Sequence, residues 1–201
     1  MKRMIALLLT LVLSLSLTAC GDSRPDPEDA VKHALDSVKT ADADGLHDSF
    51  NGELDGLMDM MGEEDRELLR LLTENITYTI DKVAEAPDGS TVVTVTVTGP
   101  DARILVPNFV KEFMAYTFQF AFQPADQMPT EEEVMAAVTE IVREVMASPD
   151  NKMVTTTVDV EVTWEGEDWK IQNEYELVNG LLGGLLDRIG ELMAAFEDIG
   201  A

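Results

Sequence analysis

One run of alternating residues, 154–164, constrains the fold of this chain more than any other feature. Four valines, Thr156 and Trp164 stand at every second position of the run, and threonines and acids fill the positions between. A period of two residues is typical of a β-strand that buries one face. Such a strand belongs to an antiparallel sheet, and its apolar face needs a covering layer of helices.

A second strand follows this run after a four-residue turn. This turn length places Trp164 directly opposite Trp169 on the apolar face. The same register carries the second strand as far as Tyr175, which then lies opposite Val158. We therefore expect the two tryptophan rings to contact each other across the strands.

Two earlier alternating runs predict another strand pair. In the run 76–80 isoleucine and tyrosine alternate with threonine, and in the run 93–97 valine alternates with threonine. A short loop between the runs pairs Ile80 with Val97, so both apolar sets share one face. Lys82 is the exception, because this register directs its side chain toward the apolar face.

Helical periodicity accounts for most of the remaining chain, since apolar residues recur there at i, i+3, i+4 and i+7. The predicted helices span residues 27–40, 42–50, 63–72, 107–121, 130–147 and 177–199. Proline favours the first turn of a helix, so the fourth helix is expected to begin at Pro107. These elements predict a single α+β domain over 27–201, in which helices cover one face of an antiparallel sheet of about four strands.

The start of the chain predicts export and lipidation. Two basic residues precede an apolar run that is too short to span a bilayer comfortably, as in a secretory signal peptide. The run ends in Leu17–Cys20, LTAC, which resembles the bacterial lipobox. The resemblance implies diglyceride transfer to the Cys20 thiol and cleavage before it. We therefore expect a signal peptide over 1–19, then a lipidated cysteine and tether over 20–26.

This anchor and the charge of the chain define where the protein is expected to work. A lipid on Cys20 would hold it at the cell membrane, facing outside the cytoplasm. The chain has 39 acidic and 14 basic residues, for a net charge of −25. That charge excludes a basic nucleic-acid footprint, so no nucleic-acid partner is expected. It also opposes adsorption to anionic lipid, so membrane attachment depends on the acyl chains.

The element order and two stretches of sequence resemble a known family. The stretches are 27–50, PEDAVKHALDSVKTADADGLHDSF, and 154–186, VTTTVDVEVTWEGEDWKIQNEYELVNGLLGGLL. They resemble small Gram-positive lipoproteins of unknown function with a nuclear-transport-factor-2-like (cystatin-like) domain. The resemblance implies a strongly curved antiparallel sheet that wraps helices into a cone, sometimes with a pocket inside. Other members of the superfamily are isomerases or dehydratases, and many are binding or accessory modules.

Residues for catalysis or metal binding are sparse. The chain has no GxSxG, GxGxxG, Walker or HExxH motif, and Cys20 is its single cysteine. Its two histidines, His33 and His47, are 14 positions apart on two predicted helices and fit ordinary helix positions. On the inward faces only Lys82 and Asn173 are polar enough for acid-base work. No metal and no cofactor is expected.

These observations favour a lipid-anchored extracytoplasmic module that is not an enzyme. Its expected partner is an envelope protein or a small apolar ligand. The tryptophan pair either closes the wide end of a filled core or borders a pocket. The candidate pocket residues are Tyr78, Phe109, Phe113, Trp164 and Trp169. The alternative is an acid-base enzyme of the dehydratase or isomerase type that uses the same cone pocket.

Overall fold

The computed structural model describes residues 24–50, 61–86 and 90–200. The predicted signal peptide and Cys20 lie outside these residues. The described elements are the helices α2 Pro27–Thr40, α3 Ala43–Ser49 and α5 Glu63–Thr73, the strands β1 Thr77–Glu85 and β2 Thr91–Pro100, the helices α6 Ala102–Phe118, η1 Ala125–Gln127 and α7 Glu131–Ala147, the strands β3 Met153–Glu165 and β4 Asp168–Ile171, and the helices α8 Glu174–Leu181 and α9 Leu185–Gly200.

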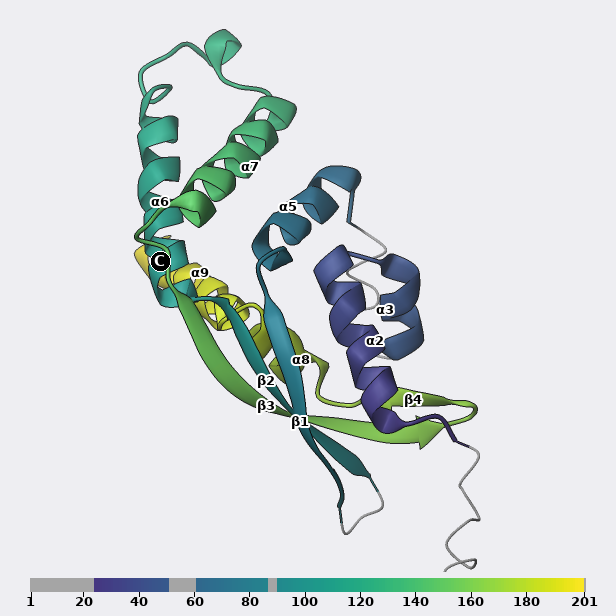
Figure 1. The fold of residues 1–201 in the computed structure, drawn as a ribbon. Coiled ribbons are helices and arrows are strands. Elements are labelled where there is room, and N and C mark those ends of the chain that lie inside the picture. Colours follow the sequence, from purple (N-terminus) through teal and green to yellow (C-terminus); the bar gives the residue numbers. More distant parts are fainter. Residues whose placement is uncertain (1–23, 51–60, 87–89, 201) are drawn as a thin grey trace, which may run out of the picture.

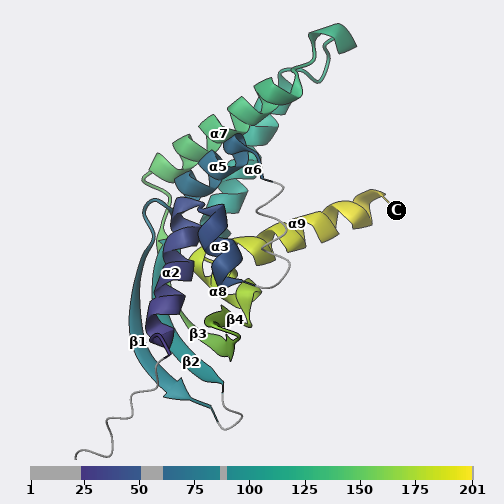
Figure 2. The same ribbon diagram turned by 90° about the vertical axis from the view of Figure 1, so that its right-hand side faces the viewer.

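The described part of the chain forms a four-stranded antiparallel sheet and seven α-helices. The strands lie in the order β1-β2-β3-β4. Figures 1 and 2 show a bent and twisted sheet, with α2, α3 and α8 on one of its faces. Val93, Val95 and Val97 of β2 face these helices and are fully buried. The predicted α+β class is confirmed, as is the covering of one sheet face by helices.

A β-bulge in β1 changes the register predicted for the first hairpin. Ile80 lies opposite Val95, so the predicted pairing of Ile80 with Val97 is wrong. The irregularity falls between Ile80 and Lys82, and beyond it Lys82 pairs with Thr94. One extra residue moves the following side chains to the opposite face. Lys82 therefore lies exposed on the threonine-rich face, and the predicted exception disappears.

The second hairpin confirms the predicted tryptophan pair but is shorter than expected. Trp164 lies directly opposite Trp169. Tyr175 does not continue β4 opposite Val158, as the sequence predicted, because it belongs to α8 and is exposed.

Asn173 explains this early end of β4. Its side-chain Oδ1 accepts a hydrogen bond from the backbone N–H of Glu161, at 2.8 Å. Its Nδ2 donates to the carbonyl oxygen of Asp159, at 2.7 Å. One side chain thus satisfies the backbone groups that a longer β4 would have paired, and the chain turns into a helix.

Helix α6 begins at Ala102, five residues before the predicted start at Pro107. Asp101 caps it, since its Oδ1 accepts hydrogen bonds from the backbone N–H of Arg103 at 3.0 Å and from Nε of Arg103 at 2.8 Å. Its Oδ2 accepts from Nη2 of the same side chain, at 2.7 Å. Pro107 lies inside the helix, where it removes one backbone donor without ending the helix.

The predicted helix over 177–199 is two helices. The chain turns between α8 and α9 at Gly183 and Gly184, which have φ angles of +61° and +86°. A Cβ on Gly183 would lie 1.8 Å from the carbonyl oxygen of Pro100, at the end of β2. Only glycine fits this close approach, so the break joins the C-terminal helices to the sheet.

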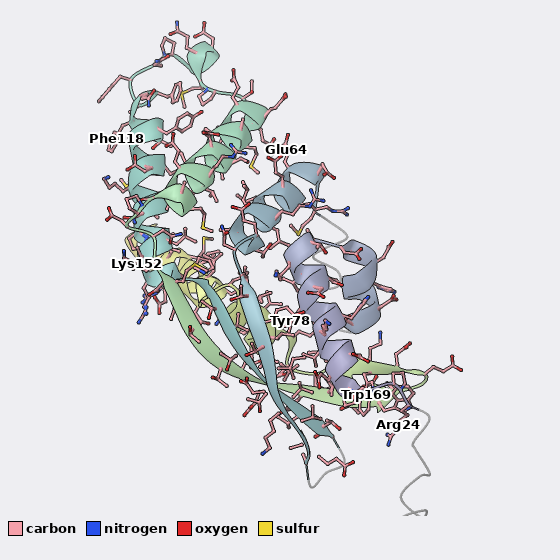
Figure 3. All side chains as sticks on the ribbon, viewed as in Figure 1. Arg24, Glu64, Tyr78, Phe118, Lys152 and Trp169 are labelled. Atoms are coloured by element: carbon pink, nitrogen blue, oxygen red, sulfur yellow. The ribbon has the colours of Figure 1, made fainter. Side chains whose placement is uncertain are left out.

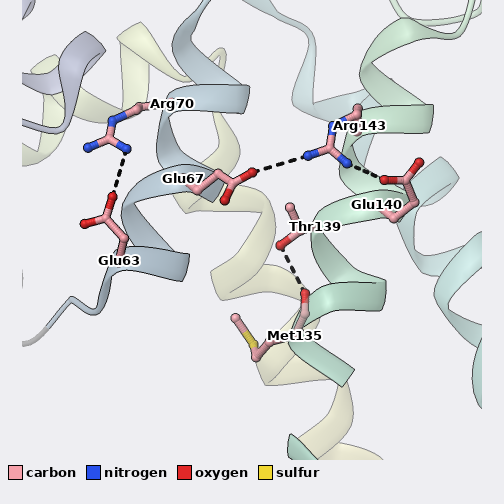
Figure 4. Close-up of polar contacts among 7 residues, drawn as sticks. All are labelled: Glu63, Glu67, Arg70, Met135, Thr139, Glu140 and Arg143. Atoms are coloured by element: carbon pink, nitrogen blue, oxygen red, sulfur yellow. Dashed lines mark hydrogen bonds and ion pairs between the residues drawn. The ribbon is translucent and has the colours of Figure 1, made fainter. Parts of the chain in front are cut away.

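Helices α6 and α7 form a hairpin that extends beyond the sheet, and α9 also projects from the body (Figures 1 and 2). Thr130 and Glu133 form the predicted capping box at the start of α7. Figure 4 shows Arg143 of α7 between Glu140 and Glu67, and Glu67 lies 3.3 Å away on α5. Exposed ion pairs of this kind contribute little to the stability of the fold. Apolar contacts therefore attach the base of the hairpin to α5.

Candidate functional site

An apolar cavity of about 170 Å³ lies where α5, α6, α7 and α9 meet. Every side chain that lines it is aliphatic or aromatic. The lining residues are Leu68, Leu72, Leu105, Val106, Phe109, Val138, Val142, Leu185, Ile189 and Leu192. The helices that supply this lining meet beside the sheet, at the base of the α6–α7 hairpin (Figure 1).

Helical spacing explains why these residues line one space. Leu68 and Leu72 are four positions apart on α5, and Leu185 and Ile189 are four apart on α9. Positions four apart lie on the same face of a helix. Each helix therefore presents one apolar stripe, and the cavity is the space that these stripes leave between them.

The cavity is closed at one side and open at the other. Leu105 and Val142 are 4% and 7% exposed, whereas Ile189 is 46% exposed. A dry apolar cavity of about 150 Å³ can hold a benzene-sized molecule. This cavity is therefore large enough for a small hydrocarbon, or for the end of a longer chain that enters beside Ile189.

The tryptophan pair lies elsewhere, where the domain begins. The rings of Trp164 and Trp169 meet edge to face, with centroids 5.4 Å apart and an interplanar angle of 72°. The indole N–H of Trp169 donates to the carbonyl oxygen of Pro25 at 2.8 Å. The guanidinium of Arg24 lies 5.6 Å from the centroid of the same ring. Trp169 thus fixes the start of the described chain against the sheet.

A wide groove of about 550 Å³ runs beside this ring. Residues 24–28 form one wall, and Val83, Glu85, Thr91 and Trp169 complete the lining. Because several of these side chains are acidic, the groove does not suit an apolar ligand.

The five predicted pocket residues therefore do not surround one space. Phe109 and Phe113 stack on α6, with centroids 5.7 Å apart, and Phe109 lines the apolar cavity. Tyr78 lies beside α2 and donates a hydrogen bond to Oδ1 of Asp36 at 2.7 Å (Figure 3). Burial and this hydrogen bond raise the pKa of Tyr78, so its hydroxyl stays protonated. Trp169 lies at the end of the sheet nearest the start of the domain (Figure 3).

Three carboxylates, those of Asp101, Asp187 and Glu191, line a polar groove of about 410 Å³ beside the α8–α9 break. The guanidinium of Arg103 lowers the pKa of Asp101. Asp187 accepts hydrogen bonds from the Tyr175 hydroxyl at 2.7 Å and from Asn179 Nδ2 at 2.8 Å, which lower its pKa as well. A general acid at neutral pH needs a raised pKa. Asp101 and Asp187 therefore act as structural acceptors.

In the described ranges, no three histidine, aspartate or glutamate side chains come together as a metal site. His33 Nδ1 lies 3.2 Å from Ser49 Oγ and so joins α2 to α3. Among the helices of 24–50, 61–86 and 90–200, none is long and apolar enough to cross a membrane.

Comparisons with protein-family models, with curated proteins and with solved structures found no match for this chain. The resemblance to nuclear-transport-factor-2-like lipoproteins therefore stays a prediction.

Proposed function

We propose that this protein is a lipid-anchored, extracytoplasmic binding module that takes a small hydrocarbon-like molecule into the cavity between α5, α6, α7 and α9. The main support for this proposal is the lining of that cavity, which consists of aliphatic and aromatic side chains alone. A ligand gains about 25 cal/mol for each Å² of apolar surface that it buries there.

The same lining favours binding over catalysis. An acid-base enzyme needs a carboxylate, histidine or similar group within hydrogen-bond reach of its substrate. The cavity lining has no such group. It also offers no polar contact to select a polar ligand, so the proposed ligand is recognised by size and shape.

The tether supports an orientation for this module. The chain from Cys20 to Arg24 spans at most about 14 Å. Arg24 and Pro25 contact Trp169, so lipidation at Cys20 would hold the tryptophan end of the sheet near the bilayer. The α6–α7 hairpin, which contributes to the cavity lining, lies toward the other end of the molecule (Figure 1).

Methyl NMR with benzene as the probe tests the binding proposal. The protein is the mature chain, 20–201, with Cys20→Ser to keep it soluble. Benzene should shift the methyl signals of Leu105, Val138 and Val142 saturably, because its ring current acts only over a short distance. Tryptophan emission is not a suitable reporter, since both tryptophans lie away from the cavity.

A cavity-filling variant gives the matched comparison. Val138→Phe adds a ring to the lining and should abolish the benzene shifts. Val134→Phe, one turn earlier on α7, adds the same ring at a position that does not line the cavity, and it should leave the shifts intact. Unchanged benzene shifts in Val138→Phe would contradict the proposal.

A further inference from the structure

The end of the α6–α7 hairpin exposes large apolar side chains. Met114, Phe118 and Phe122 recur at intervals of four and are 50%, 64% and 98% exposed, and Met128 is 51% exposed. Single exposed apolar residues are ordinary, but Met114 and Phe118 share one face of α6, and an exposed apolar face of this kind marks an interaction site. We call these four residues the hairpin patch.

The opposite side of α6 shows that the hairpin patch is not required for packing. Phe109, Phe113, Tyr116 and Phe120 form a continuous series of ring contacts, with successive centroids 5.7, 6.3 and 5.2 Å apart. Phe109, Phe113 and Tyr116 pack against the hydrophobic core, and Phe120 lies in the turn that follows α6. The fold thus uses one aromatic series internally and leaves Phe118 exposed on the hairpin, far from Trp169 (Figure 3).

Acidic side chains stand at the same end of the hairpin. Asp126 and the three glutamates at 131–133 are exposed around the turn between the helices. Between residues 104 and 150 the only basic residues are Lys111 and Arg143. Both already make ion pairs with neighbouring glutamates. The described end of the hairpin therefore combines apolar side chains with acids that no basic group of the hairpin neutralises.

We propose that the hairpin patch docks a basic amphipathic helix of a partner protein. Met114 and Phe118, four positions apart on α6, match the i, i+4 stripe of such a helix, and methionine adapts to varied partner surfaces. The acids at 131–133 would pair with lysine or arginine beside the stripe.

Charge decides against two other occupants. A second copy would bring the same acids against 131–133, and like charges facing each other are unfavourable. An anionic bilayer would repel the patch for the same reason. On the orientation proposed above, the hairpin also points away from the anchored end of the domain (Figure 2).

The test uses a synthetic helix of about 14 residues, with leucine on one face and lysine elsewhere. A peptide of the same composition in scrambled order serves as control, since it has the charge without the apolar face. Binding to the mature chain is measured by fluorescence anisotropy at two salt concentrations. The amphipathic peptide should bind with micromolar affinity, and the scrambled peptide should bind about tenfold more weakly or not at all.

Variants of exposed residues locate the binding. Phe118→Ser with Phe122→Ser should weaken binding about tenfold, because both anchors are lost. Val83→Ser removes an exposed apolar side chain of β1 and should change nothing. Glu131→Gln with Glu132→Gln should weaken binding and flatten its salt dependence. The pair spares Glu133, which caps α7.

Three results would overturn the proposal. Equal binding of both peptides would reduce the effect to general charge attraction. Unchanged binding in the double serine variant would place the site elsewhere. Self-association in sedimentation, or adsorption to phosphatidylglycerol vesicles, that disappears in that variant would make the occupant a second copy or the bilayer. None of these outcomes depends on the benzene experiment, so each proposal can be contradicted without the other.

Discussion

The two ends of this molecule use their aromatic side chains in different ways. At the end where the domain begins, Trp164 and Trp169 contact each other, and the Trp169 N–H donates to Pro25. On the hairpin, Phe118 and Phe122 are mostly exposed. The difference indicates that the tryptophans complete the fold, whereas the two phenylalanines are not needed for it. The following predictions test this contrast, from the largest effect to the smallest.

Removal of the proposed lipid attachment site should abolish membrane attachment. Cys20→Ser should release the protein from the membrane, because the acyl chains of the proposed anchor supply the attachment and the net charge opposes adsorption. Labelling of cells with an alkynyl fatty acid measures the attachment. Equal labelling of the wild-type and variant proteins would contradict it.

Core truncation should cost far more beneath the sheet than at the cavity. Leu35→Ala on α2 should lower the free energy of unfolding by about 3 to 5 kcal/mol, since this side chain is fully buried. Leu72→Ala, at the half-buried cavity wall, should cost about 1 to 2 kcal/mol. Urea unfolding measures both. Equal costs would show that the cavity wall is packed as tightly as the sheet core.

Trp169→Ala should lower the free energy of unfolding by about 2 to 4 kcal/mol, because it removes both the ring contact with Trp164 and the hydrogen bond to Pro25. Trp169→Phe keeps an aromatic ring and should cost less. The emission of Trp164, then the only tryptophan, should shift to longer wavelength in the alanine variant. A change in stability below about 0.5 kcal/mol would contradict a structural role for the ring.

Asp101→Asn should lower the free energy of unfolding by about 1 kcal/mol at pH 7, through loss of the charged acceptor for Arg103. The pKa of Asp101 is lowered in the folded state, so its contribution is present above the unfolded pKa of about 4 and is lost as the pH falls below it. The difference between the two proteins should therefore shrink toward pH 3. Asp126→Asn, at an exposed aspartate, controls for the general loss of charge.

Phe122→Ser should have the smallest effect on stability, within about 0.5 kcal/mol, since the ring contributes almost no buried area. Thermal unfolding compares the variant with the wild-type protein. A large loss of stability would show that the hairpin patch belongs to the fold and would remove the contrast between the two ends.

Much of the fold could be predicted because its signals are local. Alternation predicted the strands, and Thr130 with Glu133 predicted the start of α7. The start of α6 was misplaced because Pro107 is also tolerated within a helix whose cap, Asp101, lies further upstream. The prediction of a single pocket was wrong because it grouped the residues by their aromatic character and not by their position. The strand register places the tryptophans and α6 at opposite ends of β2.

By itself, the sequence determined the type of most strands and helices and which of their faces is apolar, except beyond the bulge in β1 and the end of β4, since these follow from periods of 2 and 3.6 residues within one segment. Tertiary structure decided the bulge between Ile80 and Lys82, the break at Gly183 and the cavity among four helices. Each of these depends on contacts between residues distant in the chain, such as the approach of Gly183 to Pro100. Local periodicity carries no information about how closely two such segments can pack.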